Sequence, residues 1–137
     1  MKVQLRNGKY PEIWLNNQWS PICGHYFWSN DYGATLFCQN LNSTHTYGIA
    51  TKKDSAIPLT SDGIRVGACK SQDSSLSSCT GGCNDFGQIG GYCSDKKPMG
   101  GCGVGKKAMF EIECDPGILT DIFSLIREYF TNYLHHS

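Results

Sequence analysis

Eight cysteines in 137 residues constrain this chain more than any other feature of its sequence. That is several times ordinary usage, and it comes with sixteen glycines and few charged residues. This composition is typical of a small domain in an oxidising compartment, where disulfides replace part of the hydrophobic core. The segment "GACKSQDSSLSSC" shows why a disulfide is needed, because Leu76 is its only large apolar side chain between Cys69 and Cys79. We expect one domain, since a chain this short buries only a modest core.

The cysteine spacing argues against two alternatives to a disulfide framework. Structural zinc sites usually repeat a close pair of thiolates, whereas only Cys79 and Cys83 are that close here. Cys69 to Cys79 and Cys83 to Cys93 are both nine-residue spacings, as in the helical hairpins of some mitochondrial intermembrane-space proteins. The glycines of "TGGCNDFGQIGGYC" exclude such a helix. The intermembrane space remains open as a compartment.

The charge balance limits the partners. Twelve basic and twelve acidic side chains cancel, and no run of like charge exceeds two lysines, so we expect neither nucleic acid nor an anionic membrane as a partner. No segment reaches the roughly 18 to 20 apolar residues that span a bilayer. The N-terminal "MKVQLRNGKY" has no apolar stretch of signal-peptide length, so the sequence does not show how the chain would enter an oxidising compartment.

Alternating apolar residues in "VQLRNG" and "PEIWLNNQWSPIC" predict a β-hairpin that turns at Asn16 and Asn17. The side chains expected to face inward are Ile13, Leu15, Trp19 and Ile22. From residue 29 the period changes to that of a helix. Its apolar face would consist of Ala34, Phe37, Cys38 and Leu41, with Ser29 or Asn30 as N-cap and Asp31 in the first turn.

The middle of the chain carries weaker signals. Residues 42–62 are polar without a clear period and are expected to form a surface loop. "GIRVGAC" is short enough to be a strand, and residues 79–105, with nine glycines and four cysteines, would be ordered mainly by crosslinks. "KAMFEIEC" alternates and predicts the strand that closes the domain.

The C-terminal residues 117–137 differ from the rest and predict an amphipathic helix that follows a domain at residues 1–116. Asp115 would cap this helix and Pro116 would occupy its first position. It could pack on its own domain, dock into another subunit, or lie on a membrane surface; docking is the interpretation we carry forward. The apolar stripe consists of Leu119, Ile122, Phe123, Ile126, Phe130, Tyr133 and Leu134.

Taken in order, "VQLRNG", "PEIWLNNQWSPIC", "NDYGATLFCQNL", "SSLSSC" and "FEIEC" resemble a scavenger receptor cysteine-rich domain, from Val3 to Cys114. The resemblance implies a small α+β fold in which a curved antiparallel sheet cradles one helix. It also implies a set of disulfides, which spacing alone would not choose among the possible pairings. The implied pairs are Cys69 with Cys79, Cys38 with Cys114, Cys23 with Cys102 (or, less well matched, Cys93), and an extra pair of Cys83 with Cys93.

Members of this family commonly hold a cation between acidic pairs. The matching positions here are Gly24 and His25, then Arg65 and Val66, which lack the oxygen ligands of calcium. The resemblance therefore implies a domain without the usual cation site, and we expect no metal and no cofactor. The remaining candidates, Asp31, Asp73 and Asp85, are interpreted as solvated loop acids.

No catalytic group is legible in the sequence. With the cysteines oxidised there is no thiolate nucleophile, and the four histidines belong to no Ser/His/Asp pattern. In "HYFW", Trp28 matches a family tryptophan expected to be buried, which leaves His25 and Tyr26 as candidate contacts for a partner. Asn42 begins an N-glycosylation sequence, Asn-Ser-Thr, in a predicted loop.

These expectations support two readings of function. The first is a non-enzymatic extracellular or lumenal module that binds a protein or glycan and is assembled through its C-terminal helix. The second is a structural subunit that braces a complex in an oxidising compartment without recognising a ligand.

Overall fold

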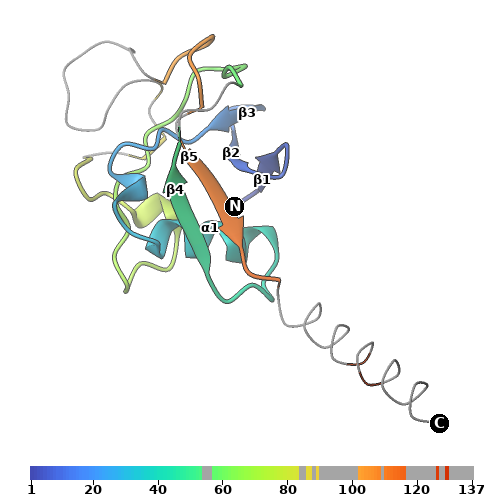
Figure 1. Cartoon of the computed structure of the whole chain (residues 1–137). Coiled ribbons are helices and arrows are strands. Elements are labelled where there is room, and N and C mark those ends of the chain that lie inside the picture. The colour runs from blue at the N-terminus through green and yellow to red at the C-terminus, as the bar shows by residue number, and fades with distance from the viewer. Residues whose placement is uncertain are drawn as a thin grey trace.

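The structure is a computed structural model that describes residues 1–53, 57–83, 86–87, 89, 102–108, 110–116, 126 and 129. Within these residues the chain forms a small α+β domain, as expected (Figure 1). Five strands and one α-helix are joined by loops that contain two single-turn 3-10 helices, η1 (Phe27–Ser29) and η2 (Leu76–Ser78).

The first three strands form an antiparallel meander whose register is set by asparagine turns. Asn7 and Gly8 make the first turn, and Asn16 and Asn17 make the second, all with positive φ. Asparagine and glycine adopt this left-handed backbone most readily, so these residues determine where each strand reverses. The strands are β1 (Val3–Arg6), β2 (Tyr10–Leu15) and β3 (Gln18–Pro21).

The predicted hairpin is present, but the assignment of Trp19 to the inner face was wrong. Ile13 on β2 lies opposite Ser20, and Trp14 lies opposite Trp19. Paired residues share one face of a sheet, so Trp19 lies with exposed Trp14 on the face opposite to Ile13. Side chains alternate with a period of two, and Trp19 therefore cannot point to the same side as buried Ile22.

The helix α1 (Tyr32–Leu41) buries Ala34 and Phe37 as predicted, but it begins differently. Asp31 is the N-cap residue and its side chain makes no capping bond. Its Oδ1 instead accepts a hydrogen bond of 3.0 Å from the Ala50 N–H. The start of the helix is thereby joined to a strand far along the chain.

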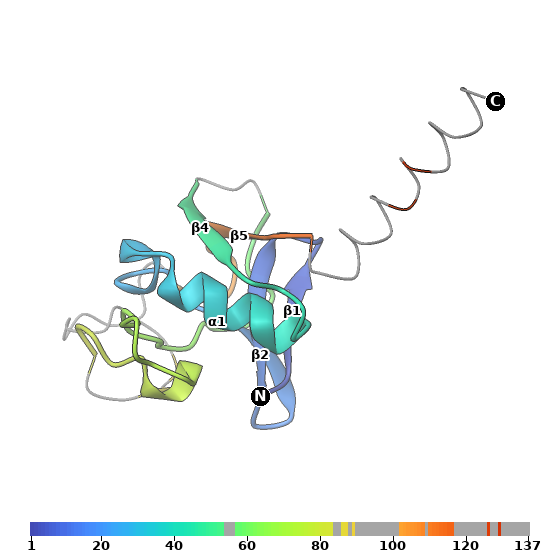
Figure 2. The ribbon, with the colours of Figure 1, turned by 90° about the horizontal axis from the view of Figure 1, so that it is seen from below.

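The prediction of a featureless loop over residues 42–62 was also wrong, because β4 (Gly48–Lys52) lies within it. β4 pairs antiparallel with β5 (Phe110–Cys114), the predicted closing strand. Its inner face packs on α1, where a side chain at Gly48 would collide with the Cys38 sulfur. Figure 2 shows α1 running alongside this pair of strands, with the β1–β2 hairpin beside it.

The strands form two sheets rather than the single curved sheet that the resemblance implies. They are joined by a hydrogen bond of 2.9 Å from the Ile112 N–H of β5 to the Lys9 carbonyl in the turn after β1. The core lies between the sheets and the helix. Its largest fully buried side chains are Phe27, Phe37, Ile13, Ile64, Leu76, Ile112 and Val66, with Cys38, Cys69 and Cys79.

The segment "GIRVGAC" is not a strand in the structure. Ile64 forms only isolated bridges, parallel with Ile22 and antiparallel with Ile89, and Ala68 bridges Gly81. Alternate burial of Ile64 and Val66 gave the strand-like pattern, because both side chains enter the core from a loop.

Three disulfides hold these parts together, and each is a pair that the resemblance implied. Cys102, not Cys93, is the partner of Cys23. Cys83 is also disulfide-bonded, and its expected partner, Cys93, lies outside the described residues. The described pairs are Cys23–Cys102, Cys38–Cys114 and Cys69–Cys79.

Candidate binding surface

The face of the β4–β5 pair that points away from α1 is hollowed. Thr51 lies opposite Glu111, and Ile49 lies opposite Glu113, on the face opposite to Ala50 and Ile112. The turn after β1 forms one wall, which leaves a hollow of about 550 Å³. We call this hollow the trough, and its lining residues are Leu5, Gly8, Lys9, Thr51, Lys53, Glu111, Ile112, Glu113 and Cys114.

The trough carries both signs of charge. Lys53 Nζ lies 3.3 Å from Glu111 Oε2, but the Lys53 side chain is 56% exposed, so this pair contributes little to stability. Lys9 and Glu113 are exposed, and neither side chain has a polar partner within the described residues. These two groups are available to pair with charges on another molecule.

One end of the trough is apolar. Tyr47 is 53% exposed and Ile49 is 43% exposed. A second hollow of about 160 Å³ lies between them and Pro116, and it shares Glu113 and Cys114 with the trough. The two hollows therefore form one continuous surface with an aromatic side chain at its end, and aromatic side chains are the commonest anchors of protein interfaces.

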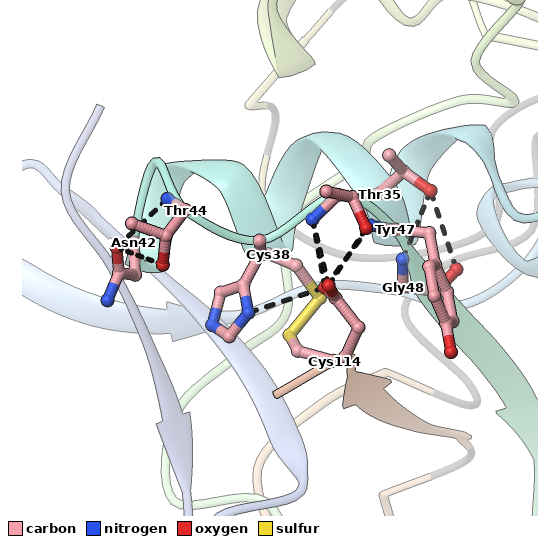
Figure 3. Close-up of polar contacts among 10 residues, drawn as sticks. Thr35, Cys38, Asn42, Thr44, Tyr47, Gly48 and Cys114 are labelled. Carbon is pink, nitrogen blue, oxygen red and sulfur yellow. Dashed lines mark hydrogen bonds and ion pairs between the residues drawn. A yellow bond between two sulfur atoms is a disulfide. The ribbon is translucent and has the colours of Figure 1, made fainter. Parts of the chain in front are cut away.

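Asp115 positions this apolar end, whose aromatic residue Tyr47 is labelled in Figure 3. Its carboxylate accepts hydrogen bonds from the N–H (3.0 Å) and hydroxyl (2.9 Å) of Thr46 and from the N–H of Tyr47 (3.2 Å). His45 Nδ1 lies 3.4 Å from Asp115 Oδ1. The sequence predicts Asp115 as the cap of a helix whose first turns lie outside the described residues, so that role stays a prediction. The structure shows Asp115 holding residues 45–47 against the end of β5.

These contacts explain the acidity of Asp115. Burial raises the pKa of a carboxyl group, but here the hydrogen bonds from Thr46 and Tyr47, together with His45, outweigh it and lower the pKa of Asp115 from 3.8 to about 2. Asp115 is therefore an anion at neutral pH.

His25 and Tyr26, the contacts predicted from sequence, are both half-buried. Their rings lie 4.3 Å apart, and the Tyr26 ring packs so closely on Gly82 that no side chain would fit there. Trp28, expected to be buried, is half-buried and packs edge-on against Phe110. Part of the Tyr26 ring is thus used inside the domain, and its role in binding stays a prediction.

The hollow beside His25 is too small for an organic ligand. Its volume is about 20 Å³, room for a single water molecule. Its walls include Ile22, Gly24, Trp28 and Phe110, which are apolar. We therefore assign no ligand pocket to this region.

Within the described residues, one cluster has metal-ligand spacing: Cys69, Asp73 and Cys79. Its two sulfur atoms are bonded to each other, and Asp73 Oδ2 accepts a hydrogen bond of 2.7 Å from the Lys70 N–H. Zinc binds thiolates, which an oxidised pair does not offer. The cluster is interpreted as the closure of a polar loop.

The positions that the resemblance alone would match to a cation site are brought together by backbone contacts. The Cys23 N–H donates to the Ile64 carbonyl at 2.9 Å, which brings Gly24 and His25 next to Arg65 and Val66. Gly24 and Val66 are buried, and none of the four residues carries a carboxylate.

Of the predicted C-terminal stripe, Ile126 is described, and it is 45% exposed. The other members, Leu119, Ile122, Phe123, Phe130, Tyr133 and Leu134, lie outside the described residues, so the helix and its contacts stay predictions. Among the described residues, no helix is long and apolar enough to cross a membrane.

The trough was missed at the sequence level because its walls come from three distant parts of the chain. Lys9 lies in a turn, Thr51 lies in a segment taken for a loop, and Glu113 lies in the last strand. The only available signal was the alternation in "FEIEC", which places Glu111 and Glu113 on one exposed face.

Comparisons of the chain with protein-family models, curated proteins and solved structures find no match. The interpretation of this surface therefore depends on its own geometry.

Proposed function

We propose that this chain is a non-enzymatic binding module of the scavenger receptor cysteine-rich type that acts outside the cell or in an oxidising lumen. The observation that carries the proposal is the disulfide framework: three pairs form, and all three are pairs that the resemblance implied. Eight cysteines can pair in roughly a hundred ways, so this agreement supports the resemblance and the oxidising compartment.

The trough is the surface that we assign to the partner. With the second hollow beside it, the trough combines two charges of opposite sign that have no partner among the described residues, Lys9 and Glu113, with the exposed side chains of Tyr47 and Ile49. Protein interfaces typically join an apolar anchor to a polar rim of this kind. A protein partner therefore fits the surface better than a glycan. Residues 117–137 would attach the domain to a larger assembly.

Lys9→Glu tests the assignment, with Lys106→Glu as a matched control. Both lysines are exposed, and each substitution replaces a positive charge with a negative one. Of the two, only Lys9 lines the trough. The probe is a multivalent form of the purified chain, applied to arrays of extracellular proteins and glycans. We expect a protein on the array to bind the wild-type chain. It should bind Lys106→Glu equally well and Lys9→Glu about tenfold more weakly, since charges at an interface select the partner.

A folded chain that binds nothing on either array, yet stays in a stable complex when isolated from its source, would contradict the binding module. That result would support the structural subunit. Binding to a glycan that Lys9→Glu leaves unchanged would remove the trough from the assignment.

A further inference from the structure

Asn42 is exposed at the point where α1 ends, and it begins the sequence Asn42-Ser43-Thr44. Asn-X-Ser/Thr occurs once in the chain. Asn42 has extended backbone angles (φ −155°, ψ 123°), and its carbonyl accepts a hydrogen bond of 3.0 Å from the His45 N–H. The residues of this sequence therefore form a surface turn after the helix.

The two ends of the Asn42 amide are in different environments. Oδ1 accepts hydrogen bonds from the N–H (3.0 Å) and the hydroxyl (2.9 Å) of Thr44 (Figure 3). Nδ2 donates no hydrogen bond to any described residue. Nearby Asn40 is also exposed, but its Nδ2 donates to the Leu36 carbonyl at 2.9 Å.

We propose that Asn42 is an N-glycosylation site. Its Nδ2 would bond to the anomeric carbon of an oligosaccharide carried on a lipid diphosphate. The bond from that carbon to the diphosphate oxygen breaks, the lipid diphosphate leaves, and Nδ2 gives up one proton; no oxidation or reduction occurs. Asn42 is exposed, and its Nδ2 donates no hydrogen bond to a described residue that the glycan would break, so the folded domain accommodates the product without rearrangement.

The inference rests on the proposed function, because the lipid-linked oligosaccharide is found in the lumen through which secreted proteins pass. The experiment gives the chain a cleavable signal peptide in cultured human cells and follows its mass before and after treatment with an N-glycosidase. We expect one glycan, which the enzyme removes. Asn42→Gln and Thr44→Val should abolish it, Thr44→Ser should retain it, and the matched control Asn40→Gln should leave it unchanged.

A second acceptor site, introduced into the same chain, serves as a positive control for the transfer. Lys9→Thr combined with Asn42→Gln creates an acceptor sequence at Asn7, in the exposed first turn. If Asn7 is modified in this variant while Asn42 stays unmodified in the wild-type chain, the proposal is overturned. Transfer takes place on the nascent chain, so whole-cell extracts report it even for a variant that folds poorly.

Disulfide mapping of the same wild-type sample separates this inference from the proposed function. An unmodified Asn42 in a chain with the expected disulfides refutes the glycosylation site alone. Free cysteines refute the proposed compartment and, with it, the reason to expect a glycan in the native setting.

Discussion

The carboxylate of Asp115 joins the end of β5 to residues that precede β4. Three donors from Thr46 and Tyr47 converge on it, and Tyr47 is the exposed aromatic at the end of the trough. The orientation of that aromatic therefore depends on a charge that lies 69 residues away from Thr46 in the sequence.

Asp115→Asn should lower the free energy of unfolding at neutral pH. It should also make that free energy vary less as the pH is lowered. The pKa of Asp115 is lower in the folded chain than its ordinary value, from 3.8 to about 2. The wild-type chain therefore has the full contribution of this group above about pH 5 and loses it as the pH falls toward 2. Urea denaturation at several pH values between 7 and 2 measures the effect.

Glu113→Gln is the control for this experiment, because Glu113 is an exposed carboxylate whose side chain makes no polar contact with a described residue. It should follow the wild-type curve closely. If Asp115→Asn also follows that curve, the hydrogen bonds from Thr46 and Tyr47 do not stabilise the fold.

Individual side chains were predictable where local alternation decides them and unpredictable where a distant partner does. Ile13 and Phe37 are buried as their periods predict. Asp31 was predicted in the first turn but is the N-cap residue, and its bond to the Ala50 N–H has no local signature in the sequence. The prediction for Trp19 was wrong because Trp19 and Ile22 are three residues apart, and a period of two does not place both on one face.

At the scale of elements, the disulfide that joins α1 to β5 and the disulfide that closes the polar loop should contribute different amounts to the free energy of unfolding. Cys38–Cys114 joins α1 to β5 across a sequence separation of 76, whereas Cys69–Cys79 spans 10. In the chain-entropy model, removing the first pair by Cys38→Ala and Cys114→Ala costs about 4 kcal/mol. Removing the second by Cys69→Ala and Cys79→Ala costs about 2.5 kcal/mol. Equilibrium denaturation of the two double variants checks the order, and equal losses would contradict it.

The helix and the N-terminal hairpin could be predicted because each has a strong local pattern. β4 could not, since "GIATK" is short and buries little: Gly48 is its only fully buried residue. Its strand conformation comes from β5 on one edge and from Asp31 and Thr35 of the helix region on the other. Partners so distant in sequence override a weak local preference.

Deletion of residues 117–137 tests the division into a domain and a tail. The segment contains no cysteine, so none of the disulfides involves it. We expect the shortened chain to remain folded and to lose self-association or complex formation, as measured by circular dichroism and by light scattering. Unfolding of the shortened chain would mean that the segment belongs to the core.

At the scale of the whole molecule, the domain is held by one modest core and by crosslinks that reach most of its parts. Cys23–Cys102 fastens the glycine-rich region to the end of the meander, Cys38–Cys114 fastens the helix, and Cys69–Cys79 closes the polar loop. The polar loop depends on its disulfide for its structure, because Leu76 is its one buried large apolar side chain. The described disulfides are compatible with an oxidising compartment, and we expect the fold to require one.

The most direct test of that claim is mass spectrometry of the native chain without reduction, followed by mapping of its crosslinked peptides. We predict a mass about 8 Da below that of the reduced chain, one hydrogen for each of the eight cysteines. The peptides should link Cys23 to Cys102, Cys38 to Cys114 and Cys69 to Cys79. Equal masses before and after reduction, or other links, would contradict the disulfide framework and the binding module built on it.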